Sequence, residues 1–393
     1  MLADSYDILI YMKQVIHAFC DLFIRILPIT GKKDSYEFAF IVHPRSRHDV
    51  AREYQFFRYF PNDLANLVTK YFWPVRISQI TGLKSQIDGK KITGHLITIL
   101  MTAHQMVENR KLALKRIIQA CVLAKKHGAK IVGLGGLTSS FSRGGLDLVH
   151  KVDINITTGH AYTSYNVTQN VFTLTRYMGL DKNKICIGVV GAAGSVGSTV
   201  AKLIVREGFM NMILIDLERK HHHFSELLAE IKRLNPQAVI EISHQIGRIQ
   251  KCDIIVAATN APEALIKAED LKPGAIIIDD AQPSDVHQNV FDRKDVLVIE
   301  AGVTYTPGLN NNFDFGLKNK QDNFCCLAEV FILAANEWNE HYVIDRATLE
   351  LVDEIVDLGK KLNFTIGNFQ NFKESISDEK LSYVKNIIYQ NGI

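Results

Sequence analysis

The chain has 393 residues, which is enough for two or three domains with a sizeable hydrophobic core. Its 47% apolar and 22% charged residues are typical of a globular protein that folds in water. The six cysteines lack regular spacing, and no CxxC, HExxH or GxxxxGK pattern occurs. We therefore expect neither a disulfide framework nor a metal. Because no cleavable signal pattern is present, we expect a cytoplasmic protein.

Positive charge is concentrated in the first half of the chain. Residues 1–180 carry 23 Lys and Arg against 12 Asp and Glu, whereas residues 181–393 carry 22 against 30. A domain boundary near Asp181 accounts for the change of sign. The basic half predicts either an anionic partner or a solvated basic face. Basic and aromatic residues also mix over residues 43–58, but no nucleic-acid-binding pattern surrounds them, so we expect no nucleic acid partner.

Residues 7–27 predict an amphipathic helix. Lys13, His17, Asp21 and Arg25 recur every four residues and form one narrow polar stripe. The charges are too frequent for a helix that spans a bilayer. We favour packing against the protein or a partner, with a peripheral contact at the inner face of the membrane as the alternative.

The rest of the first half alternates strands and helices. Strands are expected at 36–42, 75–81 and 91–98, with Asp88-Gly89 as a hairpin turn. One helix is expected over 105–127, and its basic residues include Arg110, Lys111, Lys115 and Arg116.

Two further strands, one beginning at Lys130 and one at 154–157, each run into a turn rich in glycine and hydroxyl groups. Such turns suit a polar or anionic ligand, and the alternative is a pair of ordinary connecting loops. A helix is expected after the second turn, over about 161–177. The turn residues are Gly136, Thr138, Ser139, Thr158, Gly159 and His160.

Residues 185–216 have the order strand, glycine turn, helix and strand, which is the layout of a dinucleotide-binding unit. The glycine spacing is GxxGxxG rather than GxGxxG. Glycines there allow a tight turn and a close approach of the backbone to a pyrophosphate at the helix start. An acid at the end of the second strand suits a ribose hydroxyl. The expected cofactor-binding residues are Gly191, Ala193, Gly194, Ser195, Val196, Gly197 and Asp216.

Beyond Asp216 the alternation continues with a helix at 224–234 and strands at 239–242, 254–257, 276–279 and 296–299. This order predicts a doubly wound parallel sheet. Thr259 and Asn260 follow the strand at 254–257, where the nicotinamide half of a cofactor would lie. His221, His222 and His223 point in different directions on a helix, so we expect no metal there.

Two adjacent thiols stand near the start of another predicted helix. With Asn323 as the N-cap, Cys326 is the third helical residue, where the helix dipole favours the thiolate. The alternative is that Cys325 and Cys326 only pack in the core. Amphipathic helices are expected at 346–363 and 376–390.

From about residue 85 onward, several local patterns in order resemble the long-chain acyl-acyl-carrier-protein reductases, which form fatty aldehydes. The patterns are DGKKITG at 88–94, KHG at 126–128, LGGLTS at 134–139, TTGHAYT at 157–163, GAAGSVGS at 191–198 and CLAE at 326–329. Three positions depart from the family: His160 replaces an asparagine, Cys325 adds a second thiol, and Asp216 is an acid.

The resemblance implies that Cys326 is the nucleophile that takes up a long-chain acyl group from a thioester. His160 or Tyr162 would protonate the departing thiol, and the amides and hydroxyls around Thr138, Ser139 and Thr158 would stabilise the oxyanion. The family prefers NADPH. Here Asp216 favours NADH, while Arg219 and Lys220 would suit a 2′-phosphate. The implied donor is an acidic acyl carrier protein docked on the basic half, or coenzyme A.

The sequence thus predicts an α/β fold with a Rossmann-type domain. The expected segments are an N-terminal helix (1–34), an α/β substrate domain (35–180), a Rossmann NAD(P)-binding domain (181–310) and a C-terminal helical segment with the thiol (311–393). Two other functions stay open: a shikimate-type dehydrogenase that reduces a small ketone, and a nucleotide-binding protein without turnover.

Overall fold

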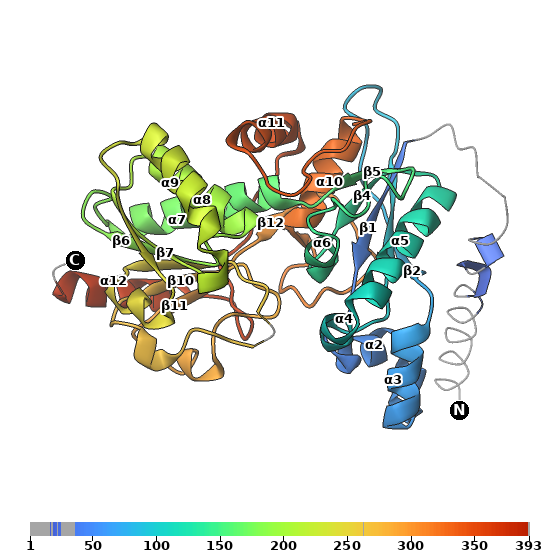
Figure 1. The fold of residues 1–393 in the computed structure, drawn as a ribbon, viewed down its shortest axis with the longest axis horizontal. Helices are drawn as coiled ribbons and strands as arrows, with labels where there is room; N and C mark the ends of the chain where they lie inside the picture. The colour runs from blue at the N-terminus through green and yellow to red at the C-terminus, as the bar shows by residue number, and fades with distance from the viewer. Residues whose placement is uncertain (1–15, 17–18, 22, 25–35, 262, 392–393) are drawn as a thin grey trace. The chain divides into compact units, whose positions relative to one another are not determined.

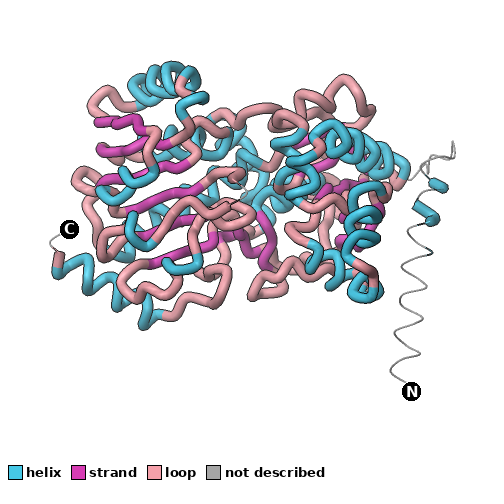
Figure 2. The backbone as a smooth tube through the Cα atoms, turned by 60° about the horizontal axis from the view of Figure 1, so that its bottom comes forward, coloured by secondary structure: helices cyan, strands magenta, loops and turns pink. Residues whose placement is uncertain are grey.

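The structure, a computed structural model, describes residues 16, 19–21, 23–24, 36–261 and 263–391. The chain divides into two compact units, each built around its own sheet (Figures 1 and 2). Unit 1 comprises residues 1–159, 308–315 and 329–345, and unit 2 comprises residues 160–307, 316–328 and 346–393. The predicted helix over 7–27 lies mostly outside the described residues.

Unit 1 is built on a five-stranded sheet in the order β2-β3-β1-β4-β5. The strands β3, β1, β4 and β5 run parallel to one another. Strand β2 pairs antiparallel with β3, and the loop that connects these two strands carries Asp88 and Gly89. Gly89 has φ +75°, which a turn residue of this kind requires. The predicted hairpin is therefore confirmed. The strands are β1 (Glu37–Val42), β2 (Val75–Ile80), β3 (Thr93–Thr98), β4 (Ala129–Leu134) and β5 (Asn155–Thr157).

The helix predicted over 105–127 is in fact two helices, α4 and α5. Asn109 separates them because its backbone, at φ −136° and ψ 72°, is not helical, and its side chain accepts the Leu112 amide as the N-cap of α5. The apolar face of α5 packs on the sheet around Ala39 and Ile97. The helices of unit 1 before the second turn are α2 (Arg47–Glu53), α3 (Asn62–Tyr71), α4 (Ala103–Glu108), α5 (Arg110–Lys126) and α6 (Leu137–Phe141).

Unit 2 is built on a six-stranded sheet in the order β11-β10-β9-β6-β7-β8, with every pair parallel. This is the strand order of a Rossmann sheet, so the predicted fold class is confirmed. Except for the edge strand β8, which is partly exposed, the strands are buried on both faces, which explains their continuous apolar character. They are β6 (Cys186–Val190), β7 (Asn211–Ile215), β8 (Val239–Ser243), β9 (Ile254–Ala257), β10 (Ile276–Asp279) and β11 (Leu297–Glu300).

Helices cover one face of this sheet, and short helical turns cover the other. A second, smaller sheet of unit 2 has the order β13-β12-β14 and leads into helix α10. The helices are α7 (His160–Met178), α8 (Ser195–Arg206), α9 (His222–Leu234), α10 (Cys325–Ala335), α11 (Leu349–Gly359) and α12 (Asp378–Gln390), and the small strands are β12 (Val303–Tyr305), β13 (Asp322–Phe324) and β14 (Thr365–Ile366). Helix α10 belongs to unit 2 as far as Ala328 and to unit 1 from Glu329.

The compact units follow boundaries that differ from the predicted segments. Helix α7 belongs to unit 2, so the division falls at Gly159 rather than near Asp181, because α7 packs on α8 through residues such as Val167 and Val171. The segment 311–393 is shared between the units.

Candidate active site

The turn between β6 and α8 needs glycine for steric reasons. Gly191 has φ +84°, and a Cβ there would lie 2.5 Å from the Ala258 carbonyl oxygen. A Cβ on Gly197 would lie 2.3 Å from the Gly191 carbonyl oxygen. Gly194 is the N-cap of α8, so the helix starts at Ser195 and Val196, as the sequence predicts. The backbone is therefore close-packed and ends at a helix N-terminus, which is the geometry that holds a pyrophosphate.

Asp216 lies directly after β7, beside this turn. Its carboxylate accepts the Ala193 amide at 2.9 Å and the Leu217 amide at 2.8 Å, and it pairs with Lys220 at 3.2 Å. Because Asp216 is only 9% exposed, much of its capacity to accept hydrogen bonds serves the turn itself. Arg219 and Lys220 lie in a short helical turn, Glu218–Lys220, immediately beyond.

Arg346 also contacts the glycine turn, and no sequence motif predicts this contact. Its guanidinium donates to the Ala193 carbonyl at 2.9 Å and to Ser198 Oγ at 3.4 Å. The next residue, Ala347, donates its amide to Ser195 Oγ at 3.3 Å. A cation beside the helix start favours a bound anion. The 153-residue separation between Arg346 and Ala193 explains why no local motif reveals it.

The turn after β9 is held by a buried acid. Thr259 donates to Asp285 through both its amide, at 3.1 Å, and its hydroxyl, at 2.6 Å. Burial raises the pKa of Asp285 to about 6. Thr259 and Asn260 thus stand at the carboxyl edge of the sheet as predicted, with Asp279 of β10 fully buried behind them.

The two adjacent cysteines occupy different environments at the start of α10. Cys325 is the first helical residue, is fully buried, and donates its amide to the Gly302 carbonyl at 2.7 Å. Cys326 is the second helical residue and is partly exposed. The prediction that Asn323 caps this helix is wrong: Asn323 lies in β13, where it pairs with Thr304 of β12, and its side-chain amide donates to Thr306 Oγ1.

His160 and Tyr162 lie in the first turn of α7. Burial lowers the pKa of His160 from 6.5 to about 4, so its ring is neutral at pH 7. The Tyr162 hydroxyl lies 3.5 Å from Thr304 Oγ1. Burial raises the pKa of Tyr162, and the charge of an ionised Cys325 raises it further. Tyr162 therefore keeps its proton and stands near the start of α10.

In unit 1, the turn after β4 is held by His43, which sequence reasoning missed. His43 Nε2 accepts the Leu137 amide at 3.1 Å, and Nδ1 lies 3.0 Å from the Pro44 carbonyl, which assigns the proton to Nδ1. Gly136 has φ +54°, and a Cβ there would lie 2.9 Å from His43 Nε2. The Thr138 hydroxyl is fully buried and donates to the Gly135 carbonyl, so it stabilises the turn.

The turn after β5 is held by Glu329, the last residue of the CLAE motif. Its buried carboxylate accepts the Gly159 amide at 3.1 Å and the Thr157 hydroxyl. The Thr158 amide donates to the Val343 carbonyl at 3.1 Å, whereas Thr158 Oγ1 is buried and makes no hydrogen bond within the described part of the chain. A buried hydroxyl without a partner is a candidate for binding a polar group of a ligand.

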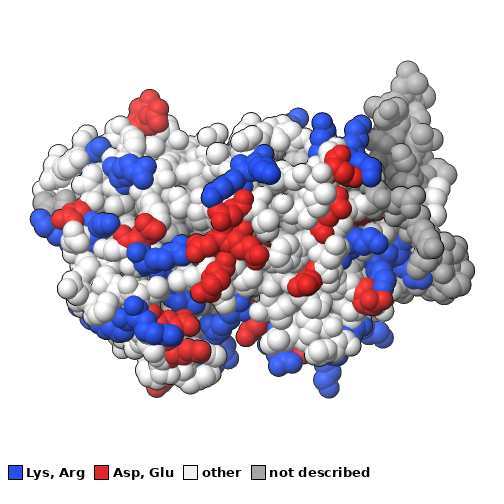
Figure 3. Space-filling view, turned by 90° about the horizontal axis from the view of Figure 1, so that it is seen from above, with Lys and Arg blue, Asp and Glu red and all other residues white. Residues whose placement is uncertain are grey.

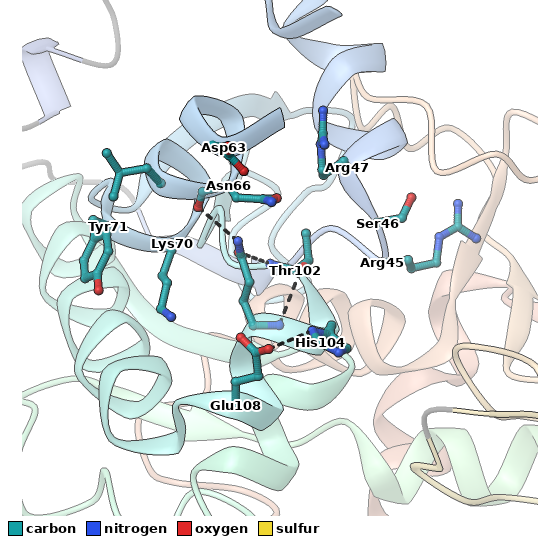
Figure 4. A pocket seen from close by; sticks show the side chains of 12 residues that line it. Arg45, Ser46, Arg47, Asp63, Asn66, Lys70, Tyr71, Thr102, His104 and Glu108 are labelled. Carbon is teal, nitrogen blue, oxygen red and sulfur yellow. Dashed lines mark hydrogen bonds and ion pairs between the residues drawn. The ribbon is translucent and has the colours of Figure 1, made fainter. Parts of the chain in front are cut away.

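Unit 1 also has a polar pocket of about 640 Å³, between α2, α3 and α4 (Figure 4). Its wall carries cations and acids together, and His104 pairs with Glu108 at 3.4 Å. Gln105 closes its floor by donating to the Asn66 carbonyl at 3.1 Å. None of the predicted site residues lines this pocket.

Metal ligands, membrane-spanning helices and surface charge bear on what the protein can bind. The structure contains, among its described residues, no group of His, Cys, Asp or Glu that could hold a metal ion, and no helix there is long and apolar enough to cross a membrane. The exposed face of α11 is acidic through Glu350, Asp353, Glu354 and Asp357, and acidic side chains gather on the corresponding face in Figure 3.

Comparisons with known proteins agree with this fold. The family model of the shikimate / quinate 5-dehydrogenases matches residues 174–301. The aminotransferase PigE of a Serratia species is 26% identical over 72% of this chain, but the match spans only 34% of that protein. The long-chain acyl-[acyl-carrier-protein] reductase of Synechococcus elongatus is 25% identical over 75% of this chain and 89% of its own length.

A glutamyl-tRNA reductase of Corynebacterium glutamicum is 25% identical over 49% of this chain and 42% of its own length. Together with the fold, these likenesses support an oxidoreductase that uses a nicotinamide dinucleotide, and the substrate follows from none of them.

Gly197→Ala tests the turn. Alanine normally stabilises a helix by about 1 kcal/mol relative to glycine, but here its Cβ meets the Gly191 carbonyl, and such overpacking costs about 1–3 kcal/mol. We expect lower stability in urea and loss of dinucleotide binding in a fluorescence titration. Gly247→Ala is the control, because the atom nearest to its Cβ would be Asp270 Oδ1, at 3.9 Å. Unchanged binding in Gly197→Ala would contradict the assignment.

His160→Asn tests the buried neutral ring. Since the folded pKa is about 4 and the unfolded value is 6.5, the unfolded state takes up the proton first as the pH falls. Stability is therefore complete above pH 6.5 and is lost between pH 6.5 and 4, by about 3 kcal/mol. Urea unfolding at several pH values should show a loss that is smaller in His160→Asn than in the native protein by this amount, because burial also lowers the pKa values of His43 and His95 and their contribution remains. The exposed His48→Asn should keep the native pH profile, and a native-like loss in His160→Asn would refute the argument.

Proposed function

We propose that this protein reduces a long-chain acyl thioester to a fatty aldehyde with NADPH or NADH, through an acyl-enzyme on Cys326. The observation that carries the proposal is the environment of Cys326. It is a partly exposed thiol in the first turn of an eleven-residue helix, within the same compact unit as the dinucleotide-binding turn. The acyl-carrier-protein reductase of Synechococcus elongatus supports this substrate class, because its similarity covers 89% of that protein.

The chemistry starts at the thiol. The positive end of the α10 dipole favours the Cys326 thiolate, which attacks the carbonyl carbon of the acyl thioester. The carbon–sulfur bond to the donor breaks, and the donor thiol leaves with a proton. Cys325 is fully buried, and its amide already donates to Gly302, so we assign it to packing.

We propose His160 and Tyr162, in the first turn of α7, as the proton donors. His160 is neutral at pH 7, and Tyr162 holds its proton, so each can donate a hydrogen bond to a developing oxyanion or to the departing thiol. The buried Thr158 hydroxyl fits a polar group of the substrate, whereas Thr138 is engaged within its own turn. Ser139 is also buried, and we propose no direct contact for it.

The cofactor is held by the glycine turn. Because Gly191 and Gly197 have no Cβ, the backbone of this turn packs closely and can approach a pyrophosphate. Arg346 and the start of α8 place positive charge beside the turn. When bound, the nicotinamide supplies the hydride that reduces the acyl carbon. Asp216 disfavours a 2′-phosphate, whereas Lys220 and Arg219 favour one, so a comparison of NADH with NADPH decides the preference.

The proposed donor is an acidic acyl carrier protein. Arg110, Lys111 and Lys115 lie exposed along α5, whereas Arg116 is partly buried and bonded to Gln119 and the Tyr71 carbonyl. The exposed three are therefore the docking residues. Coenzyme A thioesters have no acidic protein surface, so their reduction should not depend on these three residues.

Of the segment 7–27, we propose that the described residues 19–21 and 23–24 pack against the rest of unit 1. Asp21 is buried, accepts the Arg76 amide at 2.7 Å and pairs with His127 at 2.9 Å, while the Phe19 ring meets Trp73 edge-on at 5.7 Å. Phe23 is 60% exposed, and this outward apolar side suits a peripheral contact with a membrane surface. Vesicle flotation with and without residues 1–34 tests that contact.

A second function is supported by the match of residues 174–301 to the shikimate / quinate 5-dehydrogenases. Such an enzyme would reduce a small ketone and needs no thiol. Alkylation of Cys326 would leave such a dehydrogenase active. A third possibility is a nucleotide-binding protein without turnover, which would bind the cofactor but form no aldehyde.

Cys326→Ala tests the nucleophile. We expect no fatty aldehyde by mass spectrometry from a long-chain acyl thioester with either cofactor, and unchanged dinucleotide binding. Without cofactor, the native protein should carry an acyl adduct on the peptide that contains Cys326. Cys325→Ala is the matched control and should keep the activity of the folded protein. Aldehyde formation at the native rate in Cys326→Ala would contradict the assignment. Loss of aldehyde formation in Cys325→Ala alone would instead make Cys325 the nucleophile.

Lys111→Glu with Lys115→Glu tests the docking surface. We expect the KM for an acyl-carrier-protein substrate to rise about tenfold or more at low salt, and the native KM to rise steeply with salt, because exposed charges are screened. The KM for the matching coenzyme A thioester should not change. Lys251→Glu, an exposed charge in unit 2, is the control. A salt-independent native KM would count against docking on α5.

A further inference from the structure

A second pair of cysteines lies in unit 2, at the amino-terminal edge of its sheet. Cys186 is the first residue of β6, and Cys252 comes two residues before β9. Their Sγ atoms are 3.9 Å apart. The glycine turn follows the opposite end of β6, so the pair is separate from the candidate active site.

The backbone holds these two thiols side by side. The Asp253 amide donates to the Cys186 carbonyl, and the Cys186 amide donates to Asp253 Oδ2, both at 2.8 Å. A Cβ on Gly188 would lie 2.8 Å from Cys252 Sγ, so the glycine leaves the space that the Cys252 side chain fills. A disulfide needs a sulfur–sulfur distance of about 2.05 Å, which small side-chain rotations of Cys186 and Cys252 can supply.

The two thiols differ in access and in charge. Cys186 is partly exposed, and its pKa is lowered, first by the hydrogen bond with Cys252 and also by the Lys272 charge. Lys272 is held in place by an ion pair with Asp253 at 2.7 Å. Cys252 is fully buried, and its pKa is raised, first by the bond with Cys186 and then by burial. Cys186 is thus accessible to an oxidant, and Cys252 lies beside it with its sulfur within reach of the Cys186 sulfur.

We propose that Cys186 and Cys252 form a peroxide-sensitive site that closes reversibly to a disulfide. The Cys186 thiolate attacks one oxygen of hydrogen peroxide; a sulfur–oxygen bond forms, the oxygen–oxygen bond breaks, and hydroxide takes up the thiol proton as water. Cys252 sulfur then attacks Cys186 sulfur; the sulfur–sulfur bond forms, and the oxygen leaves as water with the Cys252 proton. Two thiols are oxidised, and one peroxide is reduced to two waters.

The link would join two segments 66 residues apart in the sequence. A covalent link of this length restricts the unfolded chain, so oxidation should raise the stability of unit 2. Because the pair lies at the edge of the sheet away from the glycine turn, dinucleotide binding should not change.

The test uses the full chain with Cys326→Ser, which removes the proposed nucleophile from the reaction with peroxide. After brief treatment with hydrogen peroxide, digestion under non-reducing conditions should release one peptide pair linked through Cys186 and Cys252. The loss of two hydrogens should be reversed by dithiothreitol. Thermal unfolding should shift upward by several degrees on oxidation, with unchanged dinucleotide binding.

Three variants separate the steps. In Cys252→Ser, Cys186 should stop at a sulfenic acid that dimedone traps, and the thermal shift should vanish. In Cys186→Ser, Cys252 should stay reduced. The control Cys121→Ser, a buried thiol on α5 whose pKa burial raises to about 12, should still form the linked pair. A stable sulfenic acid on Cys186 with Cys252 present, or no oxidation at Cys186, would overturn the proposal.

Discussion

The candidate site depends on one steric constraint, the close packing of backbone at the turn between β6 and α8. Side-chain atoms on Gly191 or Gly197 would fall 2.5 and 2.3 Å from carbonyl oxygens. Absence of those atoms lets α8 begin directly at the sheet edge, with its amides directed to one point. Asp216 and Arg346 then bond the amide and the carbonyl of the same residue, Ala193, so the turn is held from two sides.

The two cysteines at the start of α10 have different environments. Helix position alone would make both Cys325 and Cys326 candidates, because both stand in the first turn. Burial distinguishes them: Cys325 is enclosed and bonded through its amide to Gly302, whereas Cys326 keeps an exposed surface. Three residues later on the same helix, Glu329 holds the turn after β5 through Gly159 and Thr157. The CLAE motif therefore joins a thiol to a positioning carboxylate.

Charge is distributed in keeping with this arrangement. The exposed cations of α5 belong to unit 1, and the acidic face of α11 belongs to unit 2, which reproduces the change of sign in the sequence near residue 180. Several charges that look free in the sequence have structural partners. Arg116 bonds the Tyr71 carbonyl, Lys220 pairs with Asp216, and Asp21 pairs with His127. Composition thus indicates the sign of a surface, but not which charges remain for a partner.

Local spacing in the sequence was sufficient to predict the strand–turn–helix unit around Gly191, the parallel strands of unit 2 and the helices α11 and α12. These features arise from neighbours along the chain. It did not reveal the break at Asn109, where a side-chain hydrogen bond caps a new helix, or the place of Asn323 in β13, where Asn323 pairs with Thr304 of β12. Arg346 on the glycine turn, His43 on the Gly136 turn and the facing thiols of Cys186 and Cys252 were decided by the tertiary structure alone. Each joins residues 66 or more positions apart, and only folding brings such groups within bonding distance.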